Sequence, residues 1–150
     1  MKRIPILVAI LLALAVPMLW AKRKSPTTLV ANVYFFVPVD RDEFQDSLSL
    51  ISVATINWRD CLKVEHCGPS DLEIRFINKT GAGYAVPNAG AVTVGHQIIV
   101  FWPTVLRIWR QTASSRSRIL GNILAHEVRH TLGQHHGVGI MKPHWKPQDF

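Results

Sequence analysis

A segment of eleven residues near the C-terminal end constrains this 150-residue chain more than any other part of it. Residues 126–136 read HEVRHTLGQHH, which places histidines at 126, 130 and 136 and a glycine at 133. Apolar residues recur at helical spacing before and through the segment, with few helix breakers from Ser117 to Leu132. The sequence therefore predicts a long helix over 117–132 that carries the first two histidines.

Two of these histidines are placed so that both can bind the same metal ion. His126 and His130 are four residues apart, so they project from one face of the helix, one turn from each other. Two imidazoles in that arrangement can both reach one zinc ion at about 2.0–2.1 Å. Glu127 points roughly 100° further around the helix. Its carboxylate therefore lies beside the metal, where it can accept a proton from a zinc-bound water.

The glycine is expected to end the helix and to turn the chain so that a third histidine reaches the metal. Gly133 tolerates the positive φ that a sharp turn at a helix C-terminus requires. That turn brings His136 towards the same metal, and the neighbouring His135 is the alternative third ligand if the loop is compressed. Three protein ligands leave the fourth position open for water, which is typical of a catalytic zinc.

The motif HExxHxxGxxH, with Met141 five residues after its last histidine, resembles the metzincin clan of zinc metalloproteases. The nearest likeness is to matrixin-type and small bacterial metzincin-like proteins, and it covers about sixteen residues. The resemblance implies one catalytic Zn²⁺ held by three histidines, His126, His130 and His136. It also implies that Glu127 is the catalytic base and that Met141 lies in a methionine turn beneath the imidazoles.

The chain departs from the metzincin pattern in the region after the motif. Only four residues separate His136 from Met141, and nine residues follow Met141. Metzincins usually build a wall of their specificity pocket from this region. The resemblance therefore implies either a shallow pocket or one that another segment completes.

The N-terminal residues 1–21 predict a targeting segment. Lys2 and Arg3 precede an apolar run, Ile4–Leu19, of 16 residues. A spanning helix needs about 20 residues, so the run is short for that purpose. Two interpretations stay open: a signal peptide cleaved after Ala21, or an uncleaved N-terminal anchor formed by residues 4–19.

Charge and cysteine content bound the partners and the compartment. The formal net charge is +7, which permits contact with anionic surfaces. No recognised nucleic-acid module or basic-aromatic interleaving accompanies this charge, so no nucleic-acid partner is expected. An exported chain meets an oxidising compartment, where Cys61 and Cys67 could form a disulfide with a local pinning effect.

The remaining chain predicts a mixture of strands and helices. A helix is expected to start at Asp40 or Asp42 and to end around residues 57–60. The glycine-rich stretch 81–90 is either a surface loop or a rim of the cleft. Strands are predicted at 29–37, 71–78, 91–94 and 97–101, the last two as a hairpin about Gly95 and His96, and a short helix at 103–111.

Taken together, these patterns and the resemblance predict an α+β fold. Residues 22–150 should form a single metzincin-like (zincin) domain, a twisted mixed sheet with a long active-site helix carrying HExxH. The expected function is that of a monomeric zinc metalloendopeptidase, secreted or periplasmic, acting on a peptide or protein substrate. One alternative is a catalytically weak or inactive zinc-binding protein on the same scaffold. Another is a membrane-anchored envelope protein whose metal site is structural.

Overall fold

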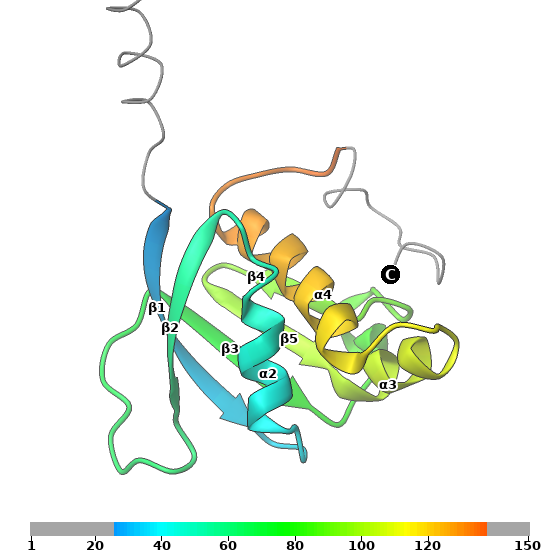
Figure 1. The fold of residues 1–150 in the computed structure, drawn as a ribbon, viewed down its shortest axis with the longest axis horizontal. Coiled ribbons are helices and arrows are strands. Elements are labelled where there is room, and N and C mark those ends of the chain that lie inside the picture. Colours follow the sequence, from blue (N-terminus) through cyan, green and yellow to red (C-terminus); the bar gives the residue numbers. More distant parts are fainter. Residues whose placement is uncertain (1–25, 138–150) are drawn as a thin grey trace, which may run out of the picture.

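The structure is a computed structural model and describes residues 26–137 (Figure 1). Within these residues the chain is an α+β domain with a five-stranded mixed sheet and three α-helices. The elements in chain order are β1 (Thr27–Phe35), α2 (Arg41–Leu48), β2 (Ala54–Asp60), β3 (Leu72–Ile77), the 3₁₀ helix η1 (Gly81–Tyr84), β4 (Ala91–Val94), β5 (Gln97–Phe101), α3 (Trp102–Arg110) and α4 (Arg116–Thr131).

The sheet has the strand order β2-β1-β3-β5-β4. The first four strands in this order are parallel, and β4 pairs antiparallel with β5. Parallel neighbours need a crossover connection, and α2 provides one between β1 and β2. Gly95, with φ at +61°, lies in the tight turn between β4 and β5, as the sequence predicted for this hairpin. β4 is the last strand in the sheet order and is therefore, within the described residues, an edge strand with one side unpaired.

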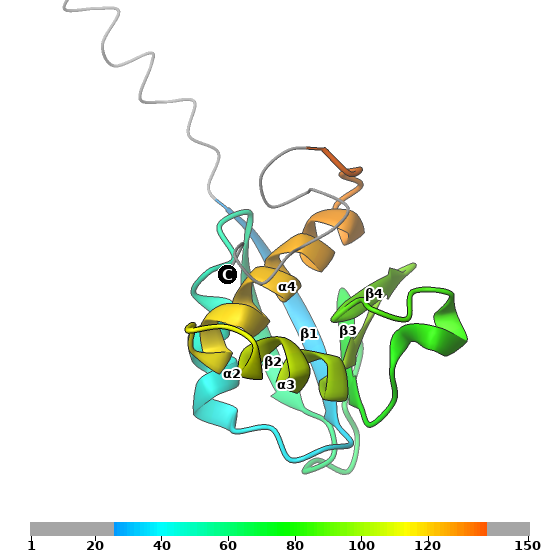
Figure 2. The same ribbon diagram turned by 90° about the vertical axis from the view of Figure 1, so that its right-hand side faces the viewer.

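Helices α2 and α4 lie together on one face of the sheet (Figures 1 and 2). An aromatic cluster joins this layer to the strands beneath it. Phe44 of α2 packs edge-on against Phe35, Trp58 and Phe76, with ring centroids 4.9 to 5.6 Å apart. Such pairs contribute beyond the burial of their area. The cluster therefore anchors α2 firmly to the sheet.

The prediction that the first helix extends to residues 57–60 is wrong. Helix α2 ends at Leu48, and Ala54–Asp60 forms strand β2 beside β1. The strand alternates buried Ala54 and Ile56 with exposed Thr55 and Asn57, which is the period of a half-buried strand. Residues 54–60 are a strand because they pair with β1, which is distant in the sequence. The other predicted elements lie within about two residues of those observed.

A glycine allows α2 and α4 to approach closely. A Cβ atom on Gly121 would lie 2.7 Å from the carbonyl oxygen of Ser47 and 2.5 Å from Leu50 Cδ1. A salt bridge of 2.8 Å between Arg116 and Glu43 joins the same two helices further along. These contacts fix α4, and with it the histidines near its C-terminal end, relative to the rest of the domain.

Cys61 and Cys67 are joined by a disulfide in the connection between β2 and β3. Disulfides are typical of proteins in oxidising, extracytoplasmic compartments. Within residues 26–137, no helix has the length and apolar character needed to cross a bilayer. The predicted targeting segment, residues 1–21, lies outside the described residues.

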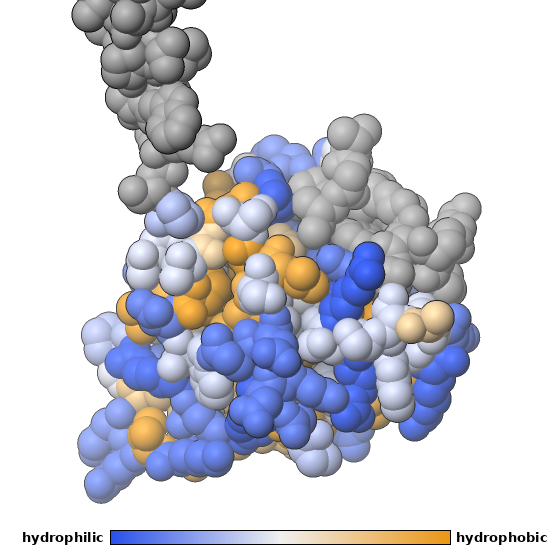
Figure 3. Space-filling view, viewed as in Figure 1, coloured by the Kyte–Doolittle hydropathy of each residue, from blue (hydrophilic) through white to orange (hydrophobic). Residues whose placement is uncertain are grey.

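The surface over the helical layer is mainly hydrophilic (Figure 3). Apolar side chains gather on this face over the α2–β2 connection and the end of α4. Leu50 and Leu132, which belong to these two segments, are among the large exposed hydrophobic residues.

Candidate metal centre

The end of α4 has a defined stereochemistry that turns the chain back on itself. Gly133 adopts a left-handed conformation with φ at +84°. The Gly133 amide donates to the His130 carbonyl at 3.0 Å, and the Gln134 amide donates to the Arg129 carbonyl at 2.9 Å. This pair of bonds is the Schellman motif. The predicted helix 117–132 is therefore observed within one residue at each end, with Gly133 as its terminating residue.

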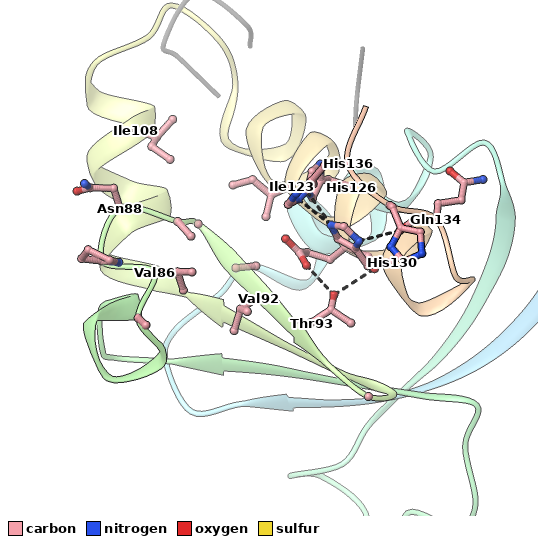
Figure 4. Close-up of a pocket in the computed structure, with 18 of the residues that line it drawn as sticks. Val86, Asn88, Val92, Thr93, Ile108, Ile123, His126, His130, Gln134 and His136 are labelled. Atoms are coloured by element: carbon pink, nitrogen blue, oxygen red, sulfur yellow. Dashed lines mark hydrogen bonds between the residues drawn. The ribbon is translucent and has the colours of Figure 1, made fainter. Parts of the chain in front are cut away.

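Three imidazoles converge at this turn (Figure 4). His130 Nε2 lies 3.1 Å from His126 Nε2 and 3.1 Å from His136 Nε2. Nitrogen ligands of a tetrahedral zinc, at about 2.0–2.1 Å from it, are themselves roughly 3.3 Å apart. The observed spacing is close to that value. The three side chains range from buried His126 to exposed His136, and together they could hold a metal ion.

One of the three rings is oriented by the backbone of the turn. His130 Nδ1 lies 2.9 Å from the carbonyl oxygen of Gln134. A carbonyl oxygen only accepts, so Nδ1 of the neutral ring carries the proton and donates it. The lone pair is then on Nε2, the atom that faces His126 and His136. Hydrogen bonds of this type orient metal-ligating histidines and fix their tautomer.

The carboxylate of Glu127 is buried next to this cluster. Its Oε2 atom accepts a hydrogen bond of 2.6 Å from the hydroxyl of Thr93, which belongs to β4. The same hydroxyl lies 3.2 Å from the Glu127 carbonyl oxygen. The sequence did not single out Thr93, because 34 residues separate the pair and neither a motif nor a periodicity links them. Only the packing of β4 against α4 reveals the contact.

The cluster opens onto a cleft of about 1030 Å³. One wall consists of β4 and the preceding segment 85–90, and the other consists of α4 and the turn after it. Ile108 of α3 and Ile123 of α4 contribute apolar surface at the end away from His130 (Figure 4). Of the two interpretations of the glycine-rich stretch, the structure places residues 85–90 at the cleft rather than in an unrelated loop.

The other predicted site residues have different positions. His135, the alternative third ligand, lines the cleft. It is not a member of the three-histidine cluster found within residues 26–137. Met141, assigned to the methionine turn, lies outside the described residues.

Comparisons with protein-family models, with curated proteins and with solved structures found no match for this chain. What the site could bind is therefore inferred from its own residues alone. The chain is an α+β domain whose last described helix bears a histidine cluster consistent with a zinc site.

Proposed function

We propose that this protein is an exported zinc-dependent endopeptidase of the metzincin type that hydrolyses peptide bonds in peptide or protein substrates. The observation that carries the proposal is the convergence of three imidazole Nε2 atoms in the same cleft as a buried carboxylate, Glu127. Ligands and a base that share one cleft suit metal-assisted hydrolysis. A purely structural metal site needs no such base.

The donor set fits zinc. Three neutral imidazoles are borderline ligands that zinc accepts readily, and a three-ligand site leaves a position for a reactant. His126, His130 and His136 would hold the ion, with Gln134 keeping the His130 ring in the required tautomer. Zinc at such a site polarises a carbonyl group and lowers the pKa of water.

Glu127 would perform the proton transfers. Its carboxylate accepts one proton from the attacking water, whose oxygen forms the new bond to the peptide carbonyl carbon. When the carbon–nitrogen bond breaks, the same carboxyl group returns that proton to the leaving nitrogen. The products are a carboxylic acid and an amine, so one water molecule is consumed for each bond cleaved.

The shape of the cleft supports an extended peptide as the substrate. β4 is an edge strand and its residues line the cleft, so a peptide can pair with it as one more strand. Ile108 and Ile123 give the cleft an apolar region. An apolar side chain of the substrate is the complement of that region.

The test measures zinc per chain and cleavage of a mixed peptide library for wild type, Glu127→Ala and His130→Ala. We expect one zinc in wild type and Glu127→Ala, with cleavage in wild type alone. His130→Ala should lose both the metal and the activity. Turnover by Glu127→Ala, or full zinc content in His130→Ala, would contradict the assigned roles.

Two results of this experiment favour the alternatives. One zinc per chain without cleavage in any variant indicates a zinc-binding protein on the same scaffold. If, in addition, the bound zinc does not bind a hydroxamate, the metal site is closed and structural. Export is tested separately by the N-terminal sequence of the mature protein, which starts near residue 22 if the segment is cleaved and at the original N-terminus if it is an anchor.

A further inference from the structure

We infer that Thr93 is a positioning residue for Glu127, and that its hydroxyl holds the carboxylate in the orientation needed for proton transfer. The inference rests on the proposed function and adds to it a residue that no motif contains. Thr93 lies on the strand along which we propose that the peptide binds, whereas Glu127 lies on the metal-bearing helix. One hydrogen bond thus connects the substrate-binding wall of the cleft to the catalytic base.

The register of β4 explains why the hydroxyl points at the helix. Thr93 is opposite Ile98, which is completely buried under the helical layer. Opposite residues in a ladder project to the same face of a sheet. The side chain of Thr93 is therefore directed towards α4, while those of Val92 and Val94 project from the other face.

The distances indicate where the single hydroxyl proton goes. Oγ1 of Thr93 is 2.6 Å from Glu127 Oε2 and 3.2 Å from the Glu127 carbonyl oxygen. The shorter contact is to the charged group, and hydrogen bonds to carboxylates are short and strong. Oε2 is thus tethered by this bond. Within residues 26–137 no hydrogen bond involves the other oxygen, Oε1, which is available for proton transfer.

A different role for Thr93 makes a distinguishable prediction. The same hydroxyl lies near the backbone of α4 and could serve only to attach β4 to that helix. In that case its removal lowers stability and leaves the chemistry of folded molecules unchanged. A positioning role instead lowers kcat, because a misplaced base affects the chemical step more than peptide binding.

The experiment compares Thr93→Val, Thr93→Ser and wild type with zinc bound. Valine has nearly the shape of threonine, favours strands and lacks the hydroxyl, whereas serine retains it. The matched control is Thr55→Val in β2, the opposite edge strand, where the side chain is exposed. Thr93→Ala replaces Thr93→Val if the latter does not fold. Zinc content, thermal unfolding, kcat and KM are measured for each protein.

With a peptide that wild type cleaves, we expect Thr93→Val to lower kcat roughly 10- to 100-fold. KM and zinc content should stay near wild type, Thr93→Ser should recover most of the activity, and Thr55→Val should behave as wild type. An unchanged kcat in Thr93→Val overturns the inference. So does a Thr93→Ser variant as impaired as Thr93→Val, or a loss of activity explained by lost zinc.

A second arm separates this inference from the proposed function. Acetohydroxamate binds a metal through its oxygens and can donate a hydrogen bond to a carboxylate beside it. Its affinity for the zinc-loaded proteins, measured by calorimetry, needs no turnover. If wild type cleaves no peptide, the proposed function fails. Thr93 is still shown to position Glu127 if Thr93→Val binds the hydroxamate roughly tenfold more weakly than Thr93→Ser. Equal affinities overturn the inference.

Discussion

The Nδ1 atom of His130 donates a hydrogen bond of 2.9 Å to the carbonyl oxygen of Gln134, four residues later and beyond the helix end. This bond spans the turn at Gly133, so the orientation of one candidate ligand depends on the path of the chain that delivers another. His136 is two residues after Gln134 and faces His130 across 3.1 Å between their Nε2 atoms. The helix terminus and the three-histidine cluster are therefore one structural unit.

The first prediction concerns the glycine in this turn. Gly133→Ala should destabilise the domain by about 1 to 2 kcal/mol, because alanine is strained at positive φ. A Cβ atom there meets nothing within 4 Å, so the cost is in the backbone alone. If the chain relieves the strain by changing its path, the Gln134 carbonyl and His136 both move. We then expect zinc affinity, measured by chelator competition, to fall roughly 10-fold or more.

Gly133→Asn provides the graded comparison for this prediction. Asparagine adopts the left-handed region more easily than alanine, so its zinc affinity should lie between those of Gly133→Ala and wild type. If alanine and asparagine bind zinc as tightly as glycine does, the turn does not determine the ligand geometry.

Removal of the metal should lower thermal stability. At a free zinc concentration about 100 times its Kd, binding to the folded state adds about 2.7 kcal/mol to the free energy of unfolding. For a domain of this size we expect a chelator to lower Tm by roughly 10 °C. Scanning calorimetry with and without chelator checks this.

His130→Ala should show no chelator effect, because it lacks one of the three ligands. The control is His66→Ala, in the β2–β3 connection away from the cleft, which should respond as wild type does. A similar response in His130→Ala would place the bound metal elsewhere.

The third prediction tests the contact between α2 and α4. Alanine is favoured over glycine within a helix by about 1 kcal/mol, and this opposes the steric cost of Gly121→Ala. Leu50 can move its side chain away, but the Ser47 carbonyl, 2.7 Å from the new Cβ, is backbone. The clash should win, with a net loss of about 1 to 2 kcal/mol in urea unfolding.

Gly83→Ala is the matched control, because a Cβ atom at Gly83 meets nothing within 4 Å. Its free energy of unfolding should stay within about 0.5 kcal/mol of wild type. A stabilised Gly121→Ala would show that the helices can separate without loss, and that their close approach does not hold α4 in place.

The sequence predicted well what depends on neighbouring residues, and poorly what depends on contacts distant along the chain. Helix α4, its end at Gly133 and the hairpin at Gly95 follow from local spacing and turn chemistry. Strand β2 was missed because residues 49–53 contain no glycine or proline to mark the end of α2, and because its partner β1 lies far away in the chain. The sheet order and the parallel pairing likewise depend on long-range contacts.

The candidate site shows the same division. The spacing of His126, His130 and His136 indicated the cluster, since a helix and one turn are enough to bring the three together. Thr93 and the lining segment 85–90 come from elements that only the tertiary structure brings to α4.

The last prediction concerns the selectivity of the proposed peptidase at the apolar end of the cleft. Ile123 lies one helical turn before His126 and lines the cleft, and its Cδ1 atom is so near Gly90 that an added Cβ would be 2.6 Å away. Ile123→Val removes one methylene from the cleft surface and enlarges the apolar region. One methylene in an apolar pocket is worth roughly 1 to 3 kcal/mol in selectivity. We therefore expect the ratio of kcat/KM for a phenylalanine-containing peptide over its leucine counterpart to rise roughly 5- to 10-fold.

Ile119→Val removes the same group from the same helix at a fully buried position that does not line the cleft. Both variants should lose about 0.5 to 1.5 kcal/mol of stability, so a general loosening of α4 affects them alike. Only Ile123→Val should change the ratio of kcat/KM values, because, of the two side chains, only that of Ile123 lines the cleft in which we propose that the peptide binds. If the ratio is the same in the two variants, the apolar end of the cleft does not select the substrate side chain, and the peptide must lie along another part of β4.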